Sequence, residues 1–229
     1  MRRAGLVPFE AVTDPTRERV MPAMWQGLAD YADFVAEFYQ KDLWQNQDVV
    51  VFFFIEKQAM EGVVAPVTRN LRVSLIPIRG QCSETWCWSV AQDWNELDKP
   101  VIVYYIGDHD SFGLSIERSL RERIEGYLDE ERKDCFQWER LAVTAADLRN
   151  LELPGFPIKR DKHGAIPTTS RAYFEEFGDR CVEADAISPI EIRRRCEEAI
   201  RRHIDSARWE AMLEIEAREK AEVRNLIAR

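Results

Sequence analysis

The chain has 229 residues, of which 45% are hydrophobic and 32% are charged, and its formal net charge is -9. This length and apolar content fit one large domain, or a domain with appendages, that can bury a packed core. The acidic balance argues against indiscriminate binding to nucleic acid, although it leaves room for a local basic surface.

The cysteines and apolar runs indicate the compartment. Five cysteines are scattered along the chain without a Cys-x-x-Cys pair, and the three histidines stand apart, so no structural zinc site is expected. An odd number of cysteines without a visible secretory signal favours reduced thiols and a cytoplasmic location. The longest apolar run, Val49–Ile55, is too short to span a bilayer, so no membrane association is expected.

The N-terminal part predicts a helical segment over residues 1–45. Prolines punctuate residues 1–22, which predicts loop and edge structure there. Residues 23–41 predict an amphipathic helix. The side chains expected to face the core are Leu28, Tyr31, Phe34, Val35 and Phe38.

The central part, residues 46–150, alternates strands with helices. The predicted strands are Val49–Ile55, Leu71–Pro77, Val101–Ile106 and Trp138–Val143. The predicted helices are 57–64, ending near Pro66; 84–95, capped by Ser83; a long helix capped by Ser111; and a short one opened by a Thr144–Asp147 capping box. This alternation predicts an α/β fold with a parallel sheet and right-handed crossovers.

The remaining chain predicts a basic loop and closing segment over residues 151–187, followed by C-terminal helices over residues 188–229. The loop, irregular over residues 151–180, carries positive charges around Lys159, so it is either a solvated connection or a phosphate contact. Ser188, Pro189 and Glu191 form a helix start. A second, highly charged helix over residues 206–228 presents a solvated face, docks on the core, or pairs with a second copy or another protein.

Acidic residues follow two of the predicted strands. Glu56 comes directly after the first strand, and Asp108 and Asp110 follow the third. Ligands of open α/β sheets bind outside the carboxyl ends of the strands, where these acids would meet. Two like charges about 4 Å apart repel by about 4 kcal/mol at an effective dielectric of about 20, so the group needs a cation, and hard oxygen ligands suit Mg²⁺. The alternatives are a helix N-terminal role for Glu56 and a turn stabilised by the two aspartates.

Four motifs carry a resemblance to a known family. They are Glu56-Lys57, Gly107-Asp108-x-Asp110-x-x-Gly113, Arg79-Gly80-x-x-Ser83 and Glu183-x-Asp185-Ala186. Together, from about residue 7 to residue 204, they resemble the Toprim domain found in the A-type subunit of topoisomerase VI and in the meiotic double-strand-break proteins, especially their phage and prophage relatives. One difference is Ser111, where the phage relatives have proline; it affects only the shape of the turn.

The resemblance implies a Toprim, Rossmann-like sheet flanked by helices, with a helical C-terminal tail. It implies that Glu56, Asp108 and Asp110 hold Mg²⁺, with Mn²⁺ as a substitute, and carry catalysis on one or two ions. The expected reaction is phosphodiester cleavage in nucleic acid, with DNA expected in preference to RNA. The enzyme would be a nuclease of a phage, mobile element or defence system. The expected phosphate contacts are Lys57, Arg79, Ser83 and Lys159, and the supporting acids are Glu183 and Asp185.

The resemblance also leaves other functions open. Gly5–Glu10 and Asp14–Arg17 resemble the end of a winged-helix region, but the part that carries the topoisomerase nucleophilic tyrosine has no counterpart in this sequence. Tyr31 and Tyr39 are expected on the amphipathic helix instead. The alternative is therefore a Toprim subunit, inactive alone, in a split topoisomerase-like complex. A third, weaker interpretation is a nucleotide-binding or regulatory protein, although no Gly-x-x-x-x-Gly-Lys motif supports an NTPase.

Overall fold

The computed structural model describes residues 22–227, so the segments Gly5–Glu10 and Asp14–Arg17 lie outside the described residues. The chain divides into two compact units. The described part of the first comprises residues 22–40 and 215–227, and the second unit is Lys41–Glu214. No helix within the described range is both long and apolar enough to cross a bilayer.

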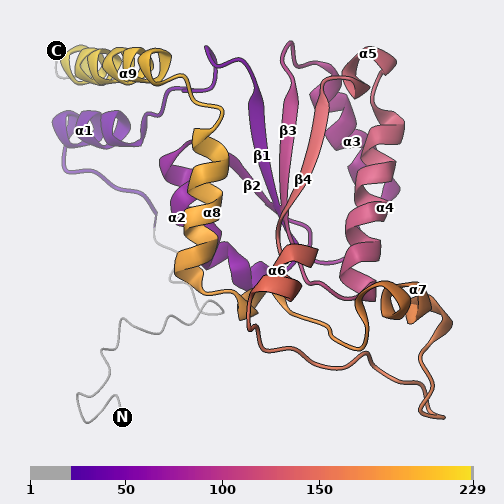
Figure 1. Ribbon diagram of the computed structural model, residues 1–229. Coiled ribbons are helices and arrows are strands. Elements are labelled where there is room, and N and C mark those ends of the chain that lie inside the picture. The colour runs from indigo at the N-terminus through magenta and orange to yellow at the C-terminus, as the bar shows by residue number, and fades with distance from the viewer. Residues whose placement is uncertain (1–21, 228–229) are drawn as a thin grey trace, which may run out of the picture. The chain divides into compact units, whose positions relative to one another are not determined.

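The second unit is built on a four-stranded, wholly parallel sheet in the order β2-β1-β3-β4 (Figure 1). The strands are β1 (Val50–Ile55), β2 (Ser74–Pro77), β3 (Val101–Ile106) and β4 (Phe136–Ala142). The predicted α/β fold is therefore confirmed, and β3 has the bounds that the sequence predicted. Every residue of β3 is buried, as a continuous apolar run at the centre of a parallel sheet requires.

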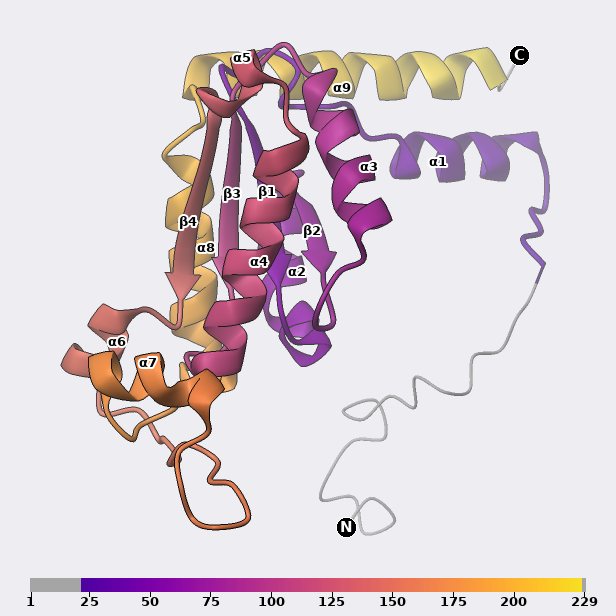
Figure 2. The same ribbon diagram turned by 90° about the vertical axis from the view of Figure 1, so that its right-hand side faces the viewer.

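Helices cover both faces of the sheet. Those of this unit are α2 (Glu61–Asn70), α3 (Glu84–Asn95), α4 (Ser111–Tyr127), α5 (Glu130–Lys133), α6 (Ala145–Asn150), α7 (Thr168–Phe177), α8 (Pro189–Arg201) and the first part of α9 (Ser206–Ile227), with short 3₁₀ turns at Gln58–Met60 and Ala184–Ala186. The pair α2 and α8 packs on one face, and α3 and α4 pack on the other (Figures 1 and 2). Beyond the carboxyl ends of the strands lie α6 and α7 (Figures 1 and 2).

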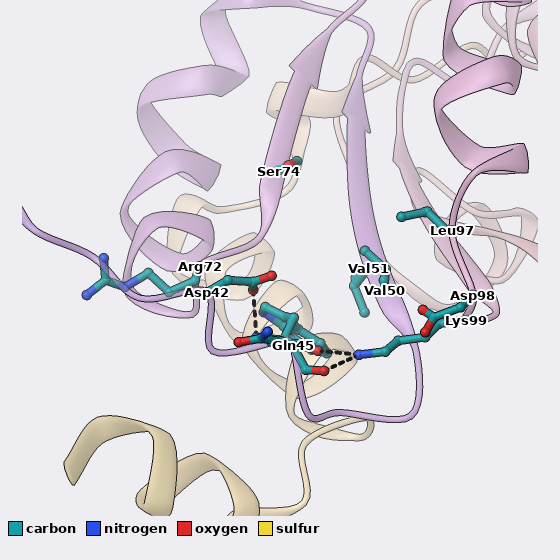
Figure 3. A pocket seen from close by; sticks show the side chains of 10 residues that line it. Asp42, Gln45, Val50, Val51, Arg72, Ser74, Leu97, Asp98 and Lys99 are labelled. Carbon is teal, nitrogen blue, oxygen red and sulfur yellow. Dashed lines mark hydrogen bonds between the residues drawn. The ribbon is translucent and has the colours of Figure 1, made fainter. Parts of the chain in front are cut away.

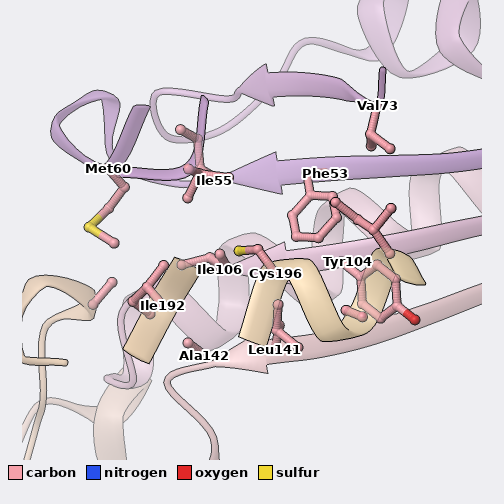
Figure 4. Close-up of a cluster of buried hydrophobic side chains, with 14 of the residues drawn as sticks. Phe53, Ile55, Met60, Val73, Tyr104, Ile106, Leu141, Ala142, Ile192 and Cys196 are labelled. Carbon is pink, nitrogen blue, oxygen red and sulfur yellow. The ribbon is translucent and has the colours of Figure 1, made fainter. Parts of the chain in front are cut away.

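The two faces of β3 belong to two separate cores. Ile102, Tyr104 and Ile106 pack into the core beneath α2 and α8, part of which Figure 4 shows. Val103 and Tyr105 pack with α3 and α4 on the opposite face. This alternation follows from the two-residue period of a strand, and each large apolar side chain that it buries contributes about 1.5–3 kcal/mol. The two cores hold the ends of β1 and β3 in fixed register.

Two predicted helix boundaries were wrong. Pro66 lies inside α2 rather than ending it. The missing hydrogen bond of the proline is outweighed by packing, since Val64, Ala65 and Thr68 are buried on either side of it. Ser111 is the first residue of α4, and Asp110 caps that helix. The side chain of Asp110 reaches two backbone N–H groups, which an N-cap must do.

Two other predictions need correction. The region 151–180 is not wholly irregular, because α7 forms within it. In the first unit, α1 (Leu28–Phe38) buries Ala32 and Ala36, whereas Leu28 and Phe38 are 71% and 67% exposed. The predicted core face of this helix was therefore wrong, since α1 belongs to a unit separate from the sheet.

The C-terminal helices follow the predicted starts. Ser188 caps α8 by accepting a hydrogen bond from the Glu191 N–H, with Pro189 at the first helical position. Trp209, in the first part of α9, packs edge-on against Trp44 with ring centroids 5.9 Å apart. This contact fits the alternative in which that part of the helix docks on the core. In the first unit, Tyr39 and the Glu219 carboxylate form a hydrogen bond.

Candidate functional site

Glu56 and Asp108 meet at the carboxyl ends of neighbouring strands. The register pairs Ile55 of β1 with Ile106 of β3, so the residues that follow the two strands lie side by side. The Glu56 N–H donates to the Ile106 carbonyl at 2.9 Å. The Glu56 Oε2 atom accepts a hydrogen bond from the Asp108 N–H at 3.0 Å. The structure thus brings together the first two acids that the sequence singled out.

Two glycines provide the space that the Glu56 carboxylate occupies. A Cβ at Gly107 would lie 2.6 Å from Glu56 Oε2 and 2.5 Å from a ring carbon of Tyr105. A Cβ at Gly113 would lie 2.5 Å from the Asp108 carbonyl oxygen and 3.2 Å from Glu56 Oε2. Neither glycine has a positive φ. They are therefore needed for close approach rather than for a left-handed backbone conformation.

A methyl group at Gly107 should displace the Glu56 carboxylate. We expect Gly107→Ala to lower the free energy of unfolding by about 1–3 kcal/mol, the usual cost of overpacking. The matched control is Gly126→Ala in α4, where an added Cβ meets nothing within 4 Å. Alanine there should stabilise the helix by about 0.5–1 kcal/mol. Urea denaturation of both variants checks the pair, and equal effects would contradict the proposed crowding at Gly107.

The charges around Asp108 form a chain of contacts. Its Oδ1 atom accepts a hydrogen bond from the Ala184 N–H at 2.8 Å, and its Oδ2 atom lies 3.3 Å from Lys57 Nζ. Lys57 Nζ also lies 2.9 Å from the Glu183 carboxylate. Lys57 therefore neutralises two acids here, and a substrate phosphate would compete with them for its ammonium group.

Burial perturbs the protonation of these groups. Burial, together with the nearby Asp108 charge, raises the pKa of Glu56 from 4.5 to about 6. Burial also raises the pKa of Asp108, and it outweighs the Ala184 hydrogen bond and the Lys57 charge, which lower it. Burial lowers the pKa of Lys57, but its hydrogen bonds and charge contacts with Glu183 and Asp108 leave that pKa raised. The two carboxyl groups thus sit where their negative charge is incompletely compensated.

Asp110 has a structural role at the start of α4. Its Oδ1 atom accepts hydrogen bonds from the N–H groups of Phe112, at 2.9 Å, and Gly113, at 2.7 Å. This is the turn-stabilising alternative that the sequence left open. Its other oxygen, Oδ2, accepts no hydrogen bond from the residues that the structure describes. One oxygen of Asp110 can therefore serve a ligand while the other caps the helix.

The donor set suits a divalent cation, although the described residues contain no preformed group of three metal-binding side chains. Glu56, Asp108 and Asp110 offer hard carboxylate oxygens, which Mg²⁺ prefers. The negative charges of Asp108 and Asp110 both raise the pKa of Glu56, and a cation would relieve this mutual repulsion. The three acids that the sequence proposed as ligands therefore fit the ion in chemistry.

The other predicted site residues differ in how close they lie to these three acids. Arg79 is exposed and has a positive φ of 50°. Ser83 caps α3 by accepting a hydrogen bond from the Trp86 N–H. Glu183 and Asp185 do not lie on one face of a strand, because a 3₁₀ turn begins at Ala184. Glu183 reaches Lys57 nonetheless, whereas Asp185 is exposed to solvent.

The sequence did not identify Arg140, which holds the turn that carries Asp108. Its guanidinium group donates to the carbonyl oxygens of Gly107, at 2.9 Å, Val143, at 2.8 Å, and Asp108, at 3.2 Å. It also pairs with Glu117 of α4 at 2.6 Å, and both side chains are only 13% exposed. The signal available in the sequence was the position of this basic residue within a predicted strand, where apolar residues are usual. Arg140 is therefore a positioning residue for the acidic turn.

His109 connects the acidic turn to α7. It is 2% exposed, and its Nδ1 atom lies 3.0 Å from the Tyr173 hydroxyl. Its backbone forms an antiparallel bridge with Val182. Burial lowers the pKa of His109 to about 4, which keeps the imidazole neutral at ordinary pH. This histidine therefore fills space between the acidic turn and α7.

Two of the cavities lie at opposite ends of the strands. One, of about 600 Å³, is lined by residues that include Asp110, Lys159 and Glu183, beside the acids. The other, of about 460 Å³, is shown in Figure 3 and lies where β1 and β2 begin, lined by residues that include Val50 and Ser74. No predicted site residue lines this second cavity. Of these two cavities, the first adjoins the candidate site.

No protein-family model matches the sequence, and no curated protein sequence matches it. The Toprim resemblance accordingly remains a prediction. The parallel sheet and the acids at its carboxyl edge are the observations on which a function can be argued.

Proposed function

We propose that this chain is a Toprim-fold, Mg²⁺-dependent enzyme that cleaves phosphodiester bonds in nucleic acid, DNA before RNA, and works in the cytoplasm. The observation that carries the proposal is the contact between Glu56 and Asp108 at the ends of adjacent parallel strands. Asp110 lies two residues further along the chain, with one oxygen left for a ligand. This edge of an open parallel sheet is where such folds bind their ligands.

The residues of the site have distinct parts in this chemistry. Glu56, Asp108 and Asp110 would hold the ion, which would neutralise charge on the phosphate and lower the pKa of an attacking water. A Glu56 pKa of about 6 lies close to physiological pH, which suits a group that takes up or releases a proton during the reaction. Lys57 Nζ lies 3.3 Å from the Asp108 carboxylate, and it can exchange its contact with Glu183 for one with a phosphate oxygen.

The test is cleavage of supercoiled plasmid, linear duplex and single-stranded RNA with Mg²⁺, Mn²⁺ or EDTA. We expect metal-dependent cleavage of DNA that falls at least about 100-fold in Asp108→Asn. Asparagine keeps an oxygen for the Ala184 N–H, so a loss reports the carboxylate charge rather than the fold. The matched control, Asp93→Asn, changes an exposed acid of α3 outside the site and should cleave normally. Cleavage that persists in Asp108→Asn would refute the proposal.

The tyrosines favour a second candidate, one component of a split topoisomerase-like complex. In the unit Lys41–Glu214, Tyr104, Tyr105 and Tyr173 are buried. Tyr127 is 39% exposed, but it ends α4, about 25 Å along the helix from the acidic turn at 1.5 Å per residue. The Tyr105 hydroxyl lies 3.5 Å from Glu56 Oε2, but Tyr105 is fully buried, so no tyrosine of this unit is both exposed and beside the acids, and a partner would have to supply one. A covalent DNA adduct that forms on a partner protein, with no cleavage by this chain alone, would favour this candidate.

A further inference from the structure

A cavity of about 600 Å³ opens beside the acidic turn and falls within the range of about 300–1,000 Å³ that small-molecule sites occupy. Three parts of the chain line it: the start of α4, the loop before α7 with the start of α7, and the segment around Cys181. Asp110 and Glu183 lie on its wall, so the cavity is continuous with the candidate site. A group bound there would lie next to the proposed metal.

Two exposed aromatic rings line this cavity. Phe112 is 64% exposed and Phe156 is 40% exposed, and they come from separate elements. Single exposed apolar residues are common on protein surfaces. Two phenylalanines on the wall of one cavity, beside a group of acids, form a more specific arrangement. Their π faces can stack with planar heteroaromatic rings.

Hydrogen-bonded backbone fixes the positions from which both rings project. Phe112 lies in the first turn of α4, and its N–H donates to the capping Asp110. Phe156 forms an antiparallel bridge with Cys181, whose two hydrogen bonds measure 2.9 Å and 2.7 Å. Little backbone entropy would thus be lost when a ligand ring contacts these side chains, which favours binding.

The charges on the cavity wall match a nucleotide rather than an apolar ligand. Lys159 is exposed and has no hydrogen bond or ion pair with the described residues, whereas Arg160 pairs with Asp179. Hydroxyl groups of Ser111 and Ser170, 2.8 Å apart, and of Thr169 add hydrogen-bonding capacity. A base needs a flat apolar contact and a polar edge, and its phosphate needs a cation. The wall offers all three.

We infer that this cavity binds the unstacked base of a nucleotide next to the cleaved bond, so that the substrate is single-stranded at the site. This inference rests on the proposed function for the position of the cleaved bond, but not for the binding itself. A base inside a duplex keeps its faces stacked on its neighbours and cannot reach Phe112 or Phe156. The cavity offers one or two cations for phosphate contacts, so the affinity for a single strand should depend only weakly on salt concentration. Two phosphate contacts give a slope of about -1.4 in log K against log salt.

The experiment measures binding without cleavage. The full chain carrying Asp108→Asn and Asp110→Asn is titrated, with Mg²⁺, into fluorescein-labelled oligonucleotides of about 12 nucleotides, single-stranded or duplex, and anisotropy is followed. Asparagine also caps helices well, so the start of α4 is retained. We expect tighter binding of the single strand, and Phe112→Ala or Phe156→Ala to weaken it about 5- to 100-fold, with little effect on duplex binding.

The matched control is Phe174→Ala, a phenylalanine of α7 that is 37% exposed and lies outside the cavity lining. It should bind like its parent, and Phe112→Tyr and Phe156→Tyr should restore binding because the ring is kept. No single-strand binding, equal losses on duplex, or unchanged binding in both alanine variants would overturn the inference. Cleavage by the wild type, together with unchanged single-strand binding in both alanine variants, would overturn the inference but leave the proposed function standing. Ring-dependent binding without any cleavage by the wild type would leave the inference standing and refute the proposed function.

Discussion

Arg140→Ala is expected to lower the free energy of unfolding by about 4 kcal/mol, because it leaves Glu117 as an unpaired, largely buried charge. It also removes the donor that the carbonyls of Gly107, Val143 and Asp108 share. The turn that carries Asp108 should loosen as a result. The measurement is urea denaturation of the wild type and the variant, followed by the cleavage assay under conditions where both are folded.

Two comparison variants separate the geometry of Arg140 from its charge. Arg140→Lys keeps the charge but not the planar fork that reaches Glu117 and several carbonyls at once, so most of the loss should remain. Arg201→Ala removes an exposed arginine that pairs with Glu197, and it should change stability little. Full stability in Arg140→Lys would show that charge alone matters at this position.

Glu56→Gln should affect activity and stability in opposite directions. Cleavage should fall at least about 100-fold, because the amide can neither exchange a proton nor neutralise a cation. Its oxygen can still accept the Asp108 N–H, so the local structure is kept. Without divalent metal, the variant should be more stable than the wild type above pH 6. A functional site often lowers the stability of the fold, so a substitution that removes activity and raises stability is expected there.

The pH dependence follows from the raised pKa of Glu56. Below pH 4.5 the group is protonated in both the folded and the unfolded wild type, so it costs nothing. Between 4.5 and its folded pKa of about 6 the unfolded chain loses the proton first, so wild-type stability falls as pH rises. The shift implies about 2 kcal/mol, or about 1 kcal/mol after allowing for solvent screening of a partly exposed carboxylate. Thermal unfolding in EDTA at pH 4 and pH 8 checks this, and a variant less stable than the wild type at pH 8 would contradict it.

The sequence predicted the sheet well because the strands have a simple pattern. An apolar run that is buried on both faces, such as β3, appears directly in the residues. Elements that depend on distant packing were harder to predict. Pro66 within α2 and the exposed apolar side of α1 both go against local rules, and only the tertiary arrangement decides them.

The residues of the candidate site also differ in how well the sequence predicted them. Glu56 and Asp108 could be paired from the sequence, because the carboxyl ends of neighbouring parallel strands share one edge. Arg140 could not, because its role is to bind backbone carbonyls of another segment, which leaves no motif. The cavity with Phe112 and Phe156 likewise joins segments that are far apart in the chain. Contacts of this kind need the fold before they can be recognised.

The central claim is that the acids at the ends of β1 and β3 hold a divalent cation, and calorimetric titration with Mg²⁺ tests it most directly. We predict that the wild type and Asp93→Asn, which changes an exposed acid of α3, bind the ion alike, whereas Glu56→Gln and Asp108→Asn each bind at least about 10-fold more weakly. The replacements keep the hydrogen bonds to the Asp108 and Ala184 N–H groups, so lost binding would report the carboxylates themselves. Equal Mg²⁺ binding by all four proteins would contradict the claim.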